Sequence, residues 1–136
     1  MPVKEISAHL KTKLSGIKLL ILDVDGVLTD GKIYLGAGGE EFKSFFVPDG
    51  SALIRGRKSG LIIAWISGRN SRAVLLRGKE LGIENIYQGV ADKVRILKQL
   101  CGRYDCGFDE VACVGDDLVE LPLFRKVGIA FAVADA

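Results

Sequence analysis

Residues 17–31 read IKLLILDVDGVLTDG, an apolar run that passes directly into a turn rich in aspartate and glycine. Four further apolar runs occur along the chain, at residues 61–66, 83–87, 111–114 and 129–133. All of them are nearly continuous rather than alternating, which is typical of strands buried on both faces of a parallel sheet. We therefore predict that residues 17–22 and the other four runs form one parallel sheet.

The segments between these runs carry helical patterns. Candidate helices lie at residues 50–58, 71–81, 92–102 and 118–125, with one more near the N-terminus at about 3–14. Within residues 92–102, Val94, Leu97 and Leu100 share one face, as in an amphipathic helix packed on a sheet. Alternating strands and helices imply right-handed crossovers, helices on both faces and a ligand site at the carboxyl ends of the strands. The predicted fold is a three-layer, Rossmann-like α/β domain.

One segment interrupts this alternation. Residues 32–46 (KIYLGAGGEEFKSFF) contain two strand-like pieces, 33–35 and 42–46, on either side of the glycine-rich stretch 36–39. Short strand-forming pieces around a glycine-rich turn are typical of a β-hairpin. We predict a hairpin insertion soon after the first strand, where a crossover helix would otherwise begin.

Length and charge exclude several classes of protein. With 136 residues, 49% of them hydrophobic, the chain is expected to form a single globular domain over residues 1–136. The formal net charge of +2 is too small for a nucleic-acid-binding surface, and no apolar stretch approaches the roughly 20 residues that span a bilayer. A single histidine, His9, excludes zinc sites with several histidines. We therefore expect carboxylate chemistry.

The cysteines indicate a reducing compartment. Cys101, Cys106 and Cys113 are odd in number, and residues 1–16 contain no continuous apolar region of a secretory signal. We expect buried or solvent-facing thiols in a cytoplasmic protein, rather than a metal site.

Polar residues follow three of the predicted strands at one edge of the sheet. They are Asp23, Asp25 and Gly26 after the first run, Ser67, Gly68 and Arg69 after the second, and Gly115, Asp116 and Asp117 after the fourth. Lys93, at the start of the helix predicted at 92–102, joins them. Each motif alone is common as a turn or a helix cap, but turn chemistry does not require that all of them meet at one edge. We interpret them as one functional site.

Carboxylates that gather at one point repel one another unless a cation lies between them. Hard oxygen ligands suit Mg²⁺, which keeps several waters and uses one or two carboxylates together with a substrate phosphate. An aspartate can attack phosphorus while a second aspartate transfers protons, and lysine and serine can hold the phosphoryl oxygens. The residues by themselves thus indicate a magnesium-dependent phosphoryl site.

The run 22–31 (LDVDGVLTDG), together with SGR at 67–69, Lys93 and GDD at 115–117, closely resembles the haloacid dehalogenase superfamily. Within it the chain is similar to the small capless phosphatases of the 3-deoxy-D-manno-octulosonate 8-phosphate (KDO 8-phosphate) phosphatase family. The resemblance covers about residues 16–136 and includes the hairpin and the phrases VPDGSAL, YQGVADK and AVADA. It implies hydrolysis of KDO 8-phosphate in the supply of this sugar for lipopolysaccharide.

The resemblance implies a catalytic role for each matching residue. Asp23 is expected to be the nucleophile, and Asp25 the general acid and base. Ser67 is expected to donate a hydrogen bond to the phosphoryl group. Lys93 is expected to neutralise charge on that group and on Asp23.

The same resemblance implies the cofactor and its ligands. Mg²⁺ is expected to bind the Asp23 carboxylate, the Asp25 backbone carbonyl and Asp116. Asp117 is expected to support this site. The family usually has aspartate in place of Glu120, and an outer role at the metal would tolerate that change.

Substrate binding is assigned to Gly68, Arg69 and Arg77. The two arginines match positions at which the family is basic, and a guanidinium suits the carboxylate of an acidic sugar. For Arg77, a solvated helix face is the alternative.

Members of the family are typically homotetramers in which the hairpin of one subunit helps to close the site of the next. On this basis Phe42, Phe45 and Phe46 are expected at an interface, with packing on the subunit's own sheet as the alternative. Relatives continue beyond the position of Ala136 with a glycine-rich, basic tail that resembles a cover for the active site.

Two other functions are compatible with the sequence. One is a phosphatase for another acid sugar phosphate, such as KDN 9-phosphate, or of broad specificity, although Arg69 favours KDO 8-phosphate. The other, from a different class, is a non-catalytic oligomeric binding domain. Glu120 supports this second alternative, whereas the intact catalytic and metal-binding residues oppose it.

Overall fold

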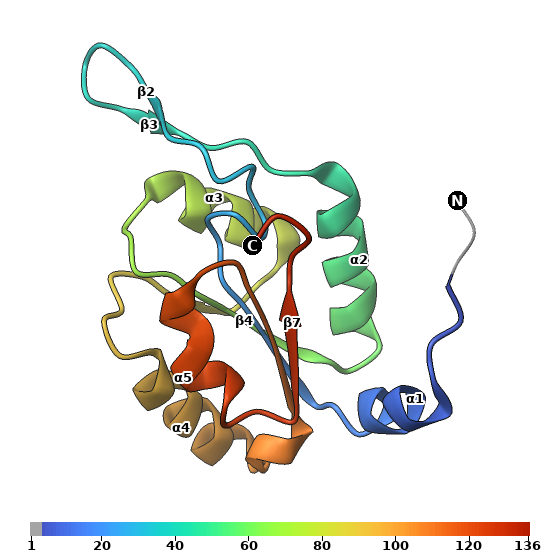
Figure 1. Cartoon of the computed structure of the whole chain (residues 1–136). Coiled ribbons are helices and arrows are strands. Elements are labelled where there is room, and N and C mark those ends of the chain that lie inside the picture. Colours follow the sequence, from blue (N-terminus) through green and yellow to red (C-terminus); the bar gives the residue numbers. More distant parts are fainter. Residues whose placement is uncertain (1–3) are drawn as a thin grey trace.

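The computed structural model describes residues 4–136, which form a parallel sheet with helices on both sides (Figure 1). Its five strands have the order β5-β4-β1-β6-β7, and every neighbouring pair is parallel. The strands are β1 (Leu19–Leu22), β4 (Ile62–Ile66), β5 (Asn85–Tyr87), β6 (Val111–Gly115) and β7 (Ile129–Ala132). The prediction that all five apolar runs share one parallel sheet is confirmed, and β1 lies at its centre.

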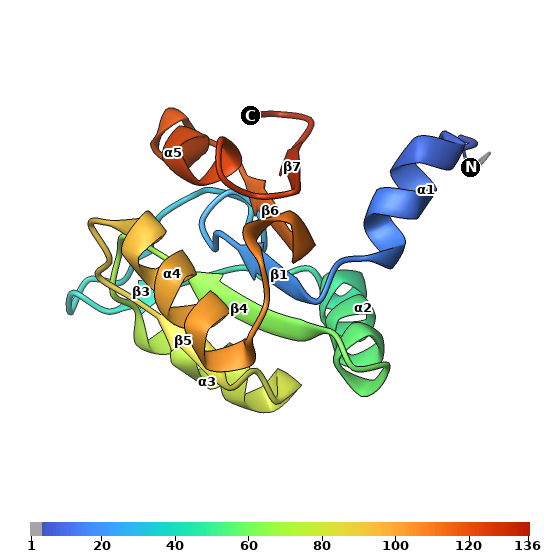
Figure 2. The same cartoon turned by 90° about the horizontal axis from the view of Figure 1, so that it is seen from below.

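Helices cover both faces of the sheet (Figure 2). They are α2 (Val47–Lys58), α3 (Arg72–Leu81), α4 (Lys93–Tyr104) and α5 (Leu121–Phe124), with 3₁₀ turns η1 (Phe108–Glu110) and η2 (Leu118–Glu120). The helix α1 (Ala8–Ser15) has no buried residue and stands apart from the sheet. Leu53 of α2 and Val74 of α3 pack on one face, whereas Leu97 of α4 and Leu123 of α5 pack on the other. The predicted three-layer, Rossmann-like arrangement is confirmed.

None of the helices within residues 4–136 combines the length and the hydropathy that crossing a bilayer requires.

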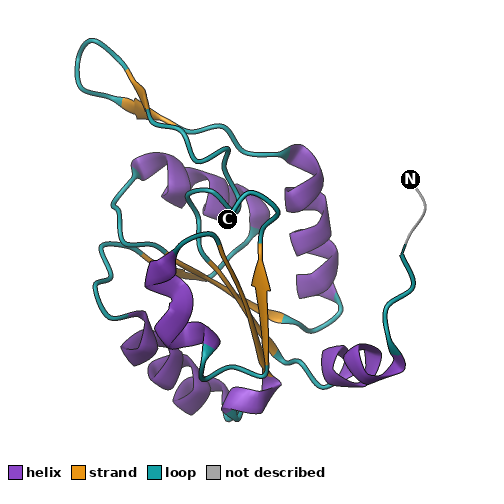
Figure 3. Cartoon of the chain, in the orientation of Figure 1, coloured by secondary structure: helices purple, strands orange, loops and turns teal. Residues whose placement is uncertain are grey.

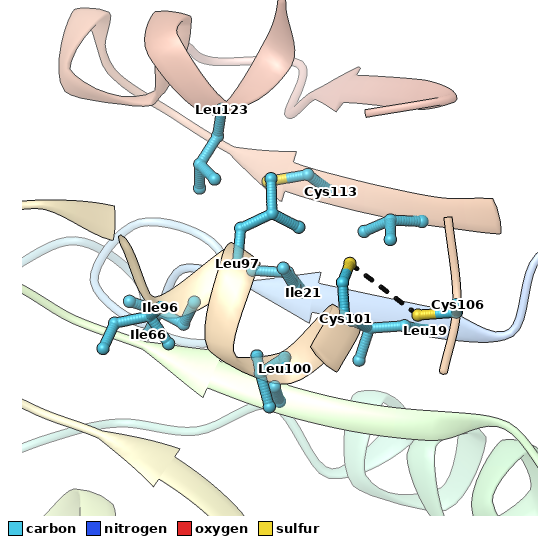
Figure 4. Close-up of a cluster of buried hydrophobic side chains, with 12 residues drawn as sticks. Leu19, Ile21, Ile66, Ile96, Leu97, Leu100, Cys101, Cys106, Cys113 and Leu123 are labelled. Carbon is cyan, nitrogen blue, oxygen red and sulfur yellow. Dashed lines mark hydrogen bonds between the residues drawn. The ribbon is translucent and has the colours of Figure 1, made fainter. Parts of the chain in front are cut away.

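The layer under α4 contains the three cysteines (Figure 4). Cys101, Cys106 and Cys113 are buried free thiols, and the Sγ atoms of the first two lie 3.7 Å apart. Burial raises the pKa of Cys113 to about 12, so this thiol stays protonated. Of the two predicted environments, the buried one is confirmed, and these side chains act as small hydrophobic residues of the core.

Some helix boundaries differ from the prediction. α2 begins at Val47 rather than at residue 50, because Pro48 fits the first turn of a helix, where its missing N–H costs no hydrogen bond. The helix predicted at 118–125 is divided into η2 and the single turn of α5, which has Pro122 near its start. The N-terminal helix begins at Ala8, and residue 3 of the range predicted for it lies outside the described residues.

The hairpin projects from the sheet beside α3 and is mostly loop (Figure 3). Its strands β2 (Tyr34–Leu35) and β3 (Glu41–Phe42) pair antiparallel, and an isolated bridge between Thr29 and Phe45 closes its base. The hairpin prediction is confirmed, with strands shorter than expected. Leu35 and Phe42 are exposed, which shows that the side chains of these short strands pack against little else in the chain.

Candidate active site

A cavity of about 350 Å³ opens at the carboxyl edge of the sheet, where the loops after β1, β4, β5 and β6 meet. Its lining residues are Asp23, Asp25, Ser67, Gly68, Arg69, Val90, Ala91, Lys93, Asp116, Asp117 and Val119. Every residue predicted to act in catalysis, metal binding or substrate binding, with the exception of Arg77, lies in this lining. Parallel strands explain the convergence, because each loop leaves its strand at the same edge.

Asp23 and Lys93 form the buried centre of the cavity. Asp23 follows β1, and its backbone N–H donates to the carbonyl oxygen of Val114, which extends the pairing of β1 with β6. The Lys93 ammonium donates to Asp23 Oδ1 at 3.1 Å and to Glu120 Oε1 at 2.5 Å. Burial by itself would lower the pKa of Lys93, but the hydrogen bond to Glu120 and the charge of Asp23 outweigh it and raise that pKa. Lys93 therefore stays positively charged.

Glu120 is the unexpected member of this centre. It is only 1% exposed, and its carboxylate binds Lys93. An outer role at the metal would tolerate glutamate at this position, and in the structure the Glu120 carboxylate lies on the lysine. The glycine of the GDD motif makes room for it, since a Cβ on Gly115 would lie 2.3 Å from Glu120 Cγ.

Asp116 also lines the cavity, and its carboxyl group is next to that of Asp23. Burial and the neighbouring Asp23 carboxyl group raise the pKa of Asp116 to about 6. The Asp116 carboxylate also packs against the backbone of Gly26, which has a positive φ of 84°; a Cβ there would lie 2.0 Å from Asp116 Oδ2. Gly26 thus allows the loop after β1 to approach the loop after β6.

The donor groups present fit a magnesium ion. No group of three or more His, Cys, Asp or Glu side chains within residues 4–136 forms a metal cage. Mg²⁺ does not need one, because it keeps several waters and commonly uses one or two carboxylates. Burial raises the pKa of Asp116 most and the Asp23 carboxyl group raises it further; a divalent cation bound by both carboxylates would offset their mutual repulsion.

Asp25 is held by Lys43 of the hairpin, which is itself paired with Glu41; neither residue was predicted from the sequence as part of the site. Lys43 Nζ donates to Asp25 Oδ1 at 2.5 Å and to Glu41 Oε1 at 3.0 Å. Glu41 Oε1 also accepts from Arg69 at 3.2 Å. One sequence signal was available, because residues 41 and 43 lie two apart in an extended segment and so share a face opposite that of Phe42.

The loop after β4 supplies the opposite wall. Ser67 is buried, its N–H donates to the carbonyl oxygen of Tyr87, and its Oγ accepts from the backbone N–H of Arg69. Gly68 and Arg69 are exposed at the cavity mouth. Asp117 is the N-cap of η2, where its carboxylate accepts from the N–H of Leu118.

The structure does not bring Arg77 into the cavity. Its guanidinium binds Glu80 at 2.9 Å and lies 6.0 Å from the centroid of the Phe45 ring. Phe45 in turn stacks on Trp65 of β4, so packing on the subunit's own sheet is confirmed for this phenylalanine. The side chain of Arg77 is only 16% exposed, so the alternative of a solvated helix face is wrong, whereas its assignment to the sugar stays a prediction. Arg77 lies in the second turn of α3, which carries it away from the sheet edge.

Sequence comparison identifies relatives over nearly the whole chain. The model of the haloacid dehalogenase-like hydrolase family matches residues 69–136. The 3-deoxy-D-manno-octulosonate 8-phosphate phosphatase of Salmonella typhi is 45% identical over 131 residues, which cover 96% of this chain and 70% of the relative. The corresponding enzyme of Escherichia coli K12 is 44% identical with the same coverage.

Solved structures show the same fold. The phosphatase of this name from Yersinia pestis superimposes with a TM-score of 0.94 at 40% identity, covering 96% of this chain and 71% of the other. The enzyme from Moraxella catarrhalis, solved with a magnesium ion, a phosphate ion and KDO, gives 0.91 at 40% identity, covering 94% and 74%. The resemblance inferred from the DVDG, SGR and GDD motifs is confirmed: this chain belongs to the KDO 8-phosphate phosphatase family of the haloacid dehalogenase-like hydrolases.

Proposed function

We propose that this chain is a magnesium-dependent phosphomonoesterase that hydrolyses KDO 8-phosphate to KDO and phosphate. The observation that carries the proposal is the convergence of Asp23, Asp25, Lys93 and Asp116 on one cavity of about 350 Å³. The names of the relatives, and the magnesium, phosphate and KDO bound in the Moraxella catarrhalis structure, support the same substrate and cofactor.

The first half of the proposed reaction transfers the phosphoryl group to the enzyme. A carboxylate oxygen of Asp23 attacks phosphorus, and the bond between phosphorus and the sugar oxygen breaks. Asp25, which lines the same cavity, protonates the departing sugar oxygen. This step leaves an aspartyl-phosphate on Asp23 and an ionised Asp25.

The second half releases phosphate. A water attacks the phosphorus of the aspartyl-phosphate and gives a proton to Asp25. The bond between phosphorus and Asp23 breaks, which restores the Asp23 carboxylate and the protonated Asp25. Each residue thus returns to its starting state after one turnover.

The surrounding groups hold the phosphoryl oxygens as charge moves. Lys93 supplies a positive charge next to Asp23, and Ser67 is buried at the wall with a hydroxyl that can donate a hydrogen bond. The carboxylates of Asp23 and Asp116 and the backbone carbonyl of Asp25 would hold Mg²⁺, with Asp117 in support. When bound, the ion supplies positive charge to the phosphoryl group.

The sugar is expected to meet the mouth of the cavity at Gly68 and Arg69. Arg69 is about half exposed, and within residues 4–136 it forms an ion pair with Glu41 alone, a single contact at 3.2 Å. Its guanidinium can exchange this partner for the carboxylate of the acidic sugar, to which it offers two parallel hydrogen bonds. Arg77, the other arginine assigned to the sugar, does not line this cavity, and its role stays a prediction.

We also infer a cytoplasmic homotetramer. Phe42 on β3 and Phe46 at the end of the hairpin are exposed, and they give an apolar surface of the kind that contacts between subunits cover. Size-exclusion chromatography with light scattering tests the assembly, and a monomer at micromolar concentration would contradict it.

Phosphate release from a substrate panel tests the activity. The panel contains KDO 8-phosphate, KDN 9-phosphate and p-nitrophenyl phosphate, each assayed with excess Mg²⁺ and after chelation. We expect the highest kcat/KM for KDO 8-phosphate and loss of activity on chelation that added Mg²⁺ restores. Equal, low rates with all three esters would favour broad specificity, and no release from any of them would favour a binding domain.

A further inference from the structure

Lys43 of the hairpin is a buried lysine that does not line the cavity but binds Asp25, which does. Lys43 follows β3, and its side chain is 1% exposed although the neighbouring Phe42 points to solvent. Its ammonium binds Asp25 Oδ1 at 2.5 Å and Glu41 Oε1 at 3.0 Å. We propose that Lys43 is a positioning residue, which orients the Asp25 carboxyl group and selects the oxygen that carries the transferable proton. This inference rests on the function proposed above.

Because Lys43 is buried, breaking its ion pair with Asp25 would be energetically costly. An ammonium group removed from water requires charged or hydrogen-bonding partners, and Lys43 has two carboxylates. The Asp25 side chain is 28% exposed and reaches the cavity, whereas Lys43 approaches it from the protein side. Rotation of the Asp25 carboxyl group would leave the buried ammonium with one partner, which disfavours other orientations.

The chemistry of the pair determines where the proton lies. An ammonium group has donors only, so Asp25 Oδ1 must accept from Lys43 in both protonation states. A proton on Asp25 therefore belongs on Oδ2, the oxygen not bound to Lys43. General acid catalysis requires the proton at the oxygen that faces the leaving group, and Lys43 provides that selection.

The base of the hairpin supports the position of Lys43. Two residues further along, Phe45 forms the bridge with Thr29 and stacks on Trp65, with ring centroids 6.5 Å apart. On the other side Glu41 joins Lys43 to Arg69 at the cavity mouth. The hairpin is thus connected to Asp25 by buried charge and to the sheet by aromatic packing.

Leaving-group chemistry separates this role from a purely structural one. A sugar oxygen departs as an unstable alkoxide unless an acid protonates it, whereas p-nitrophenolate is stable without a proton. The ratio kcat/KM reports steps up to the first irreversible one, here the transfer of the phosphoryl group to Asp23. A defect in proton donation therefore lowers kcat/KM for the sugar ester and spares the aryl ester.

The test compares Lys43→Met, Lys43→Arg and Lys32→Met with the parent. Lys32 is an exposed lysine at the start of the same hairpin and serves as the matched control. We expect Lys43→Met to lower kcat/KM for KDO 8-phosphate about 10- to 100-fold and to change that for p-nitrophenyl phosphate by less than about 3-fold. Lys43→Arg should restore part of the loss, and Lys32→Met should behave as the parent. An equal loss with both esters, or no loss, would overturn the proposal.

A structural measurement distinguishes this inference from the proposed function. If the parent hydrolyses neither ester, the proposed function fails, and crystal structures of the parent and Lys43→Met then decide the role of Lys43. We expect the Asp25 carboxyl group to rotate in the variant, and an unchanged orientation would overturn the inference.

If Lys43→Met does not fold, Glu41→Gln provides a second test, because it weakens one partner of Lys43. This variant should give a smaller loss of kcat/KM with the same ester dependence, and an equal loss with both esters would again overturn the inference.

Discussion

Two buried lysines of this molecule each bind one aspartate and one glutamate, but they lie on elements that are packed to different extents. Lys93 lies between Asp23 and Glu120, and Lys43 lies between Asp25 and Glu41. Both side chains are almost completely buried, at 9% and 1% exposed. In each case a buried cation is stabilised by two carboxylates, one of which is a proposed catalytic aspartate.

The elements that carry these lysines differ. Lys93 begins α4, whose Ile96, Leu97 and Leu100 are part of the core layer in Figure 4. Lys43 lies on a hairpin of short strands that is attached to the sheet mainly through Phe45. Segments with few buried contacts open locally at lower free energy than core elements. We conclude that the phosphoryl side of the site is supported by the core, whereas the leaving-group side depends on the hairpin.

Asp23→Asn is expected to have the largest effect, because it removes the proposed nucleophile. The amide has nearly the same shape, but it cannot attack phosphorus, and kcat should fall by at least about 10⁴-fold. Phosphate release under excess Mg²⁺ measures the loss, and circular dichroism checks that the variant is folded. Activity close to that of the parent would refute the assigned nucleophile.

Lys93→Met tests the side of the site that the core supports. We expect kcat to fall roughly 10²- to 10³-fold, because a cation next to the phosphoryl group is lost. Glu120 would be left as a buried, unpaired carboxylate, so the free energy of unfolding should decrease by about 3–5 kcal/mol.

The double variant Lys93→Met/Glu120→Gln is the control for this stability effect. It removes both charges, and it should recover part of the lost free energy of unfolding in urea denaturation while remaining poorly active. If the double variant is no more stable than Lys93→Met, Glu120 is not the partner that makes the single change costly.

A pair of packing variants compares the two supports directly. Leu97→Ala creates a cavity under α4 and should reduce the free energy of unfolding by about 2–5 kcal/mol. Phe45→Ala removes the stack on Trp65 and the contact with Arg77, and it should cost about 1–2 kcal/mol. Hydrogen exchange should show faster opening of residues 32–46 in Phe45→Ala, beyond any change in the rest of the chain. Uniformly faster exchange would mean that the hairpin does not open separately.

The smallest expected effect concerns pH. Burial would lower the pKa of both lysines, but the hydrogen bonds to Glu120 and to Asp25 outweigh it, so both pKa values lie above the ordinary 10.5. A raised lysine pKa contributes stability that is fully present below the unfolded pKa and is lost as the pH rises through the folded one. The stability difference between the parent and Lys93→Met or Lys43→Met should therefore be constant between about pH 7 and 10 and shrink above it. Urea denaturation across this range measures it, and a difference that shrinks already below about pH 9 would contradict these pKa shifts.

Much of the fold and the site could be predicted from the order of residues along the chain. A strand buried on both faces has a distinct apolar pattern, and in a parallel sheet every strand ends at the same edge. Residues that directly follow a strand, such as Asp23, Ser67 and Asp116, are therefore assigned to that edge before any side chain is placed. The glycines at 26 and 115 allow the close approaches that the motifs around them require.

Only the tertiary structure decided how charged side chains pair. Lys43 binds Asp25 and Glu120 binds Lys93 because these groups lose water on burial and must find partners among the side chains that the packed elements bring within reach. Within this chain the guanidinium of Arg77 lies on Phe45 and Glu80, which its position in the sequence did not predict. Sequence spacing specifies which edge or face a residue occupies, whereas its partner across the molecule depends on distances and directions that exist only once the layers have packed.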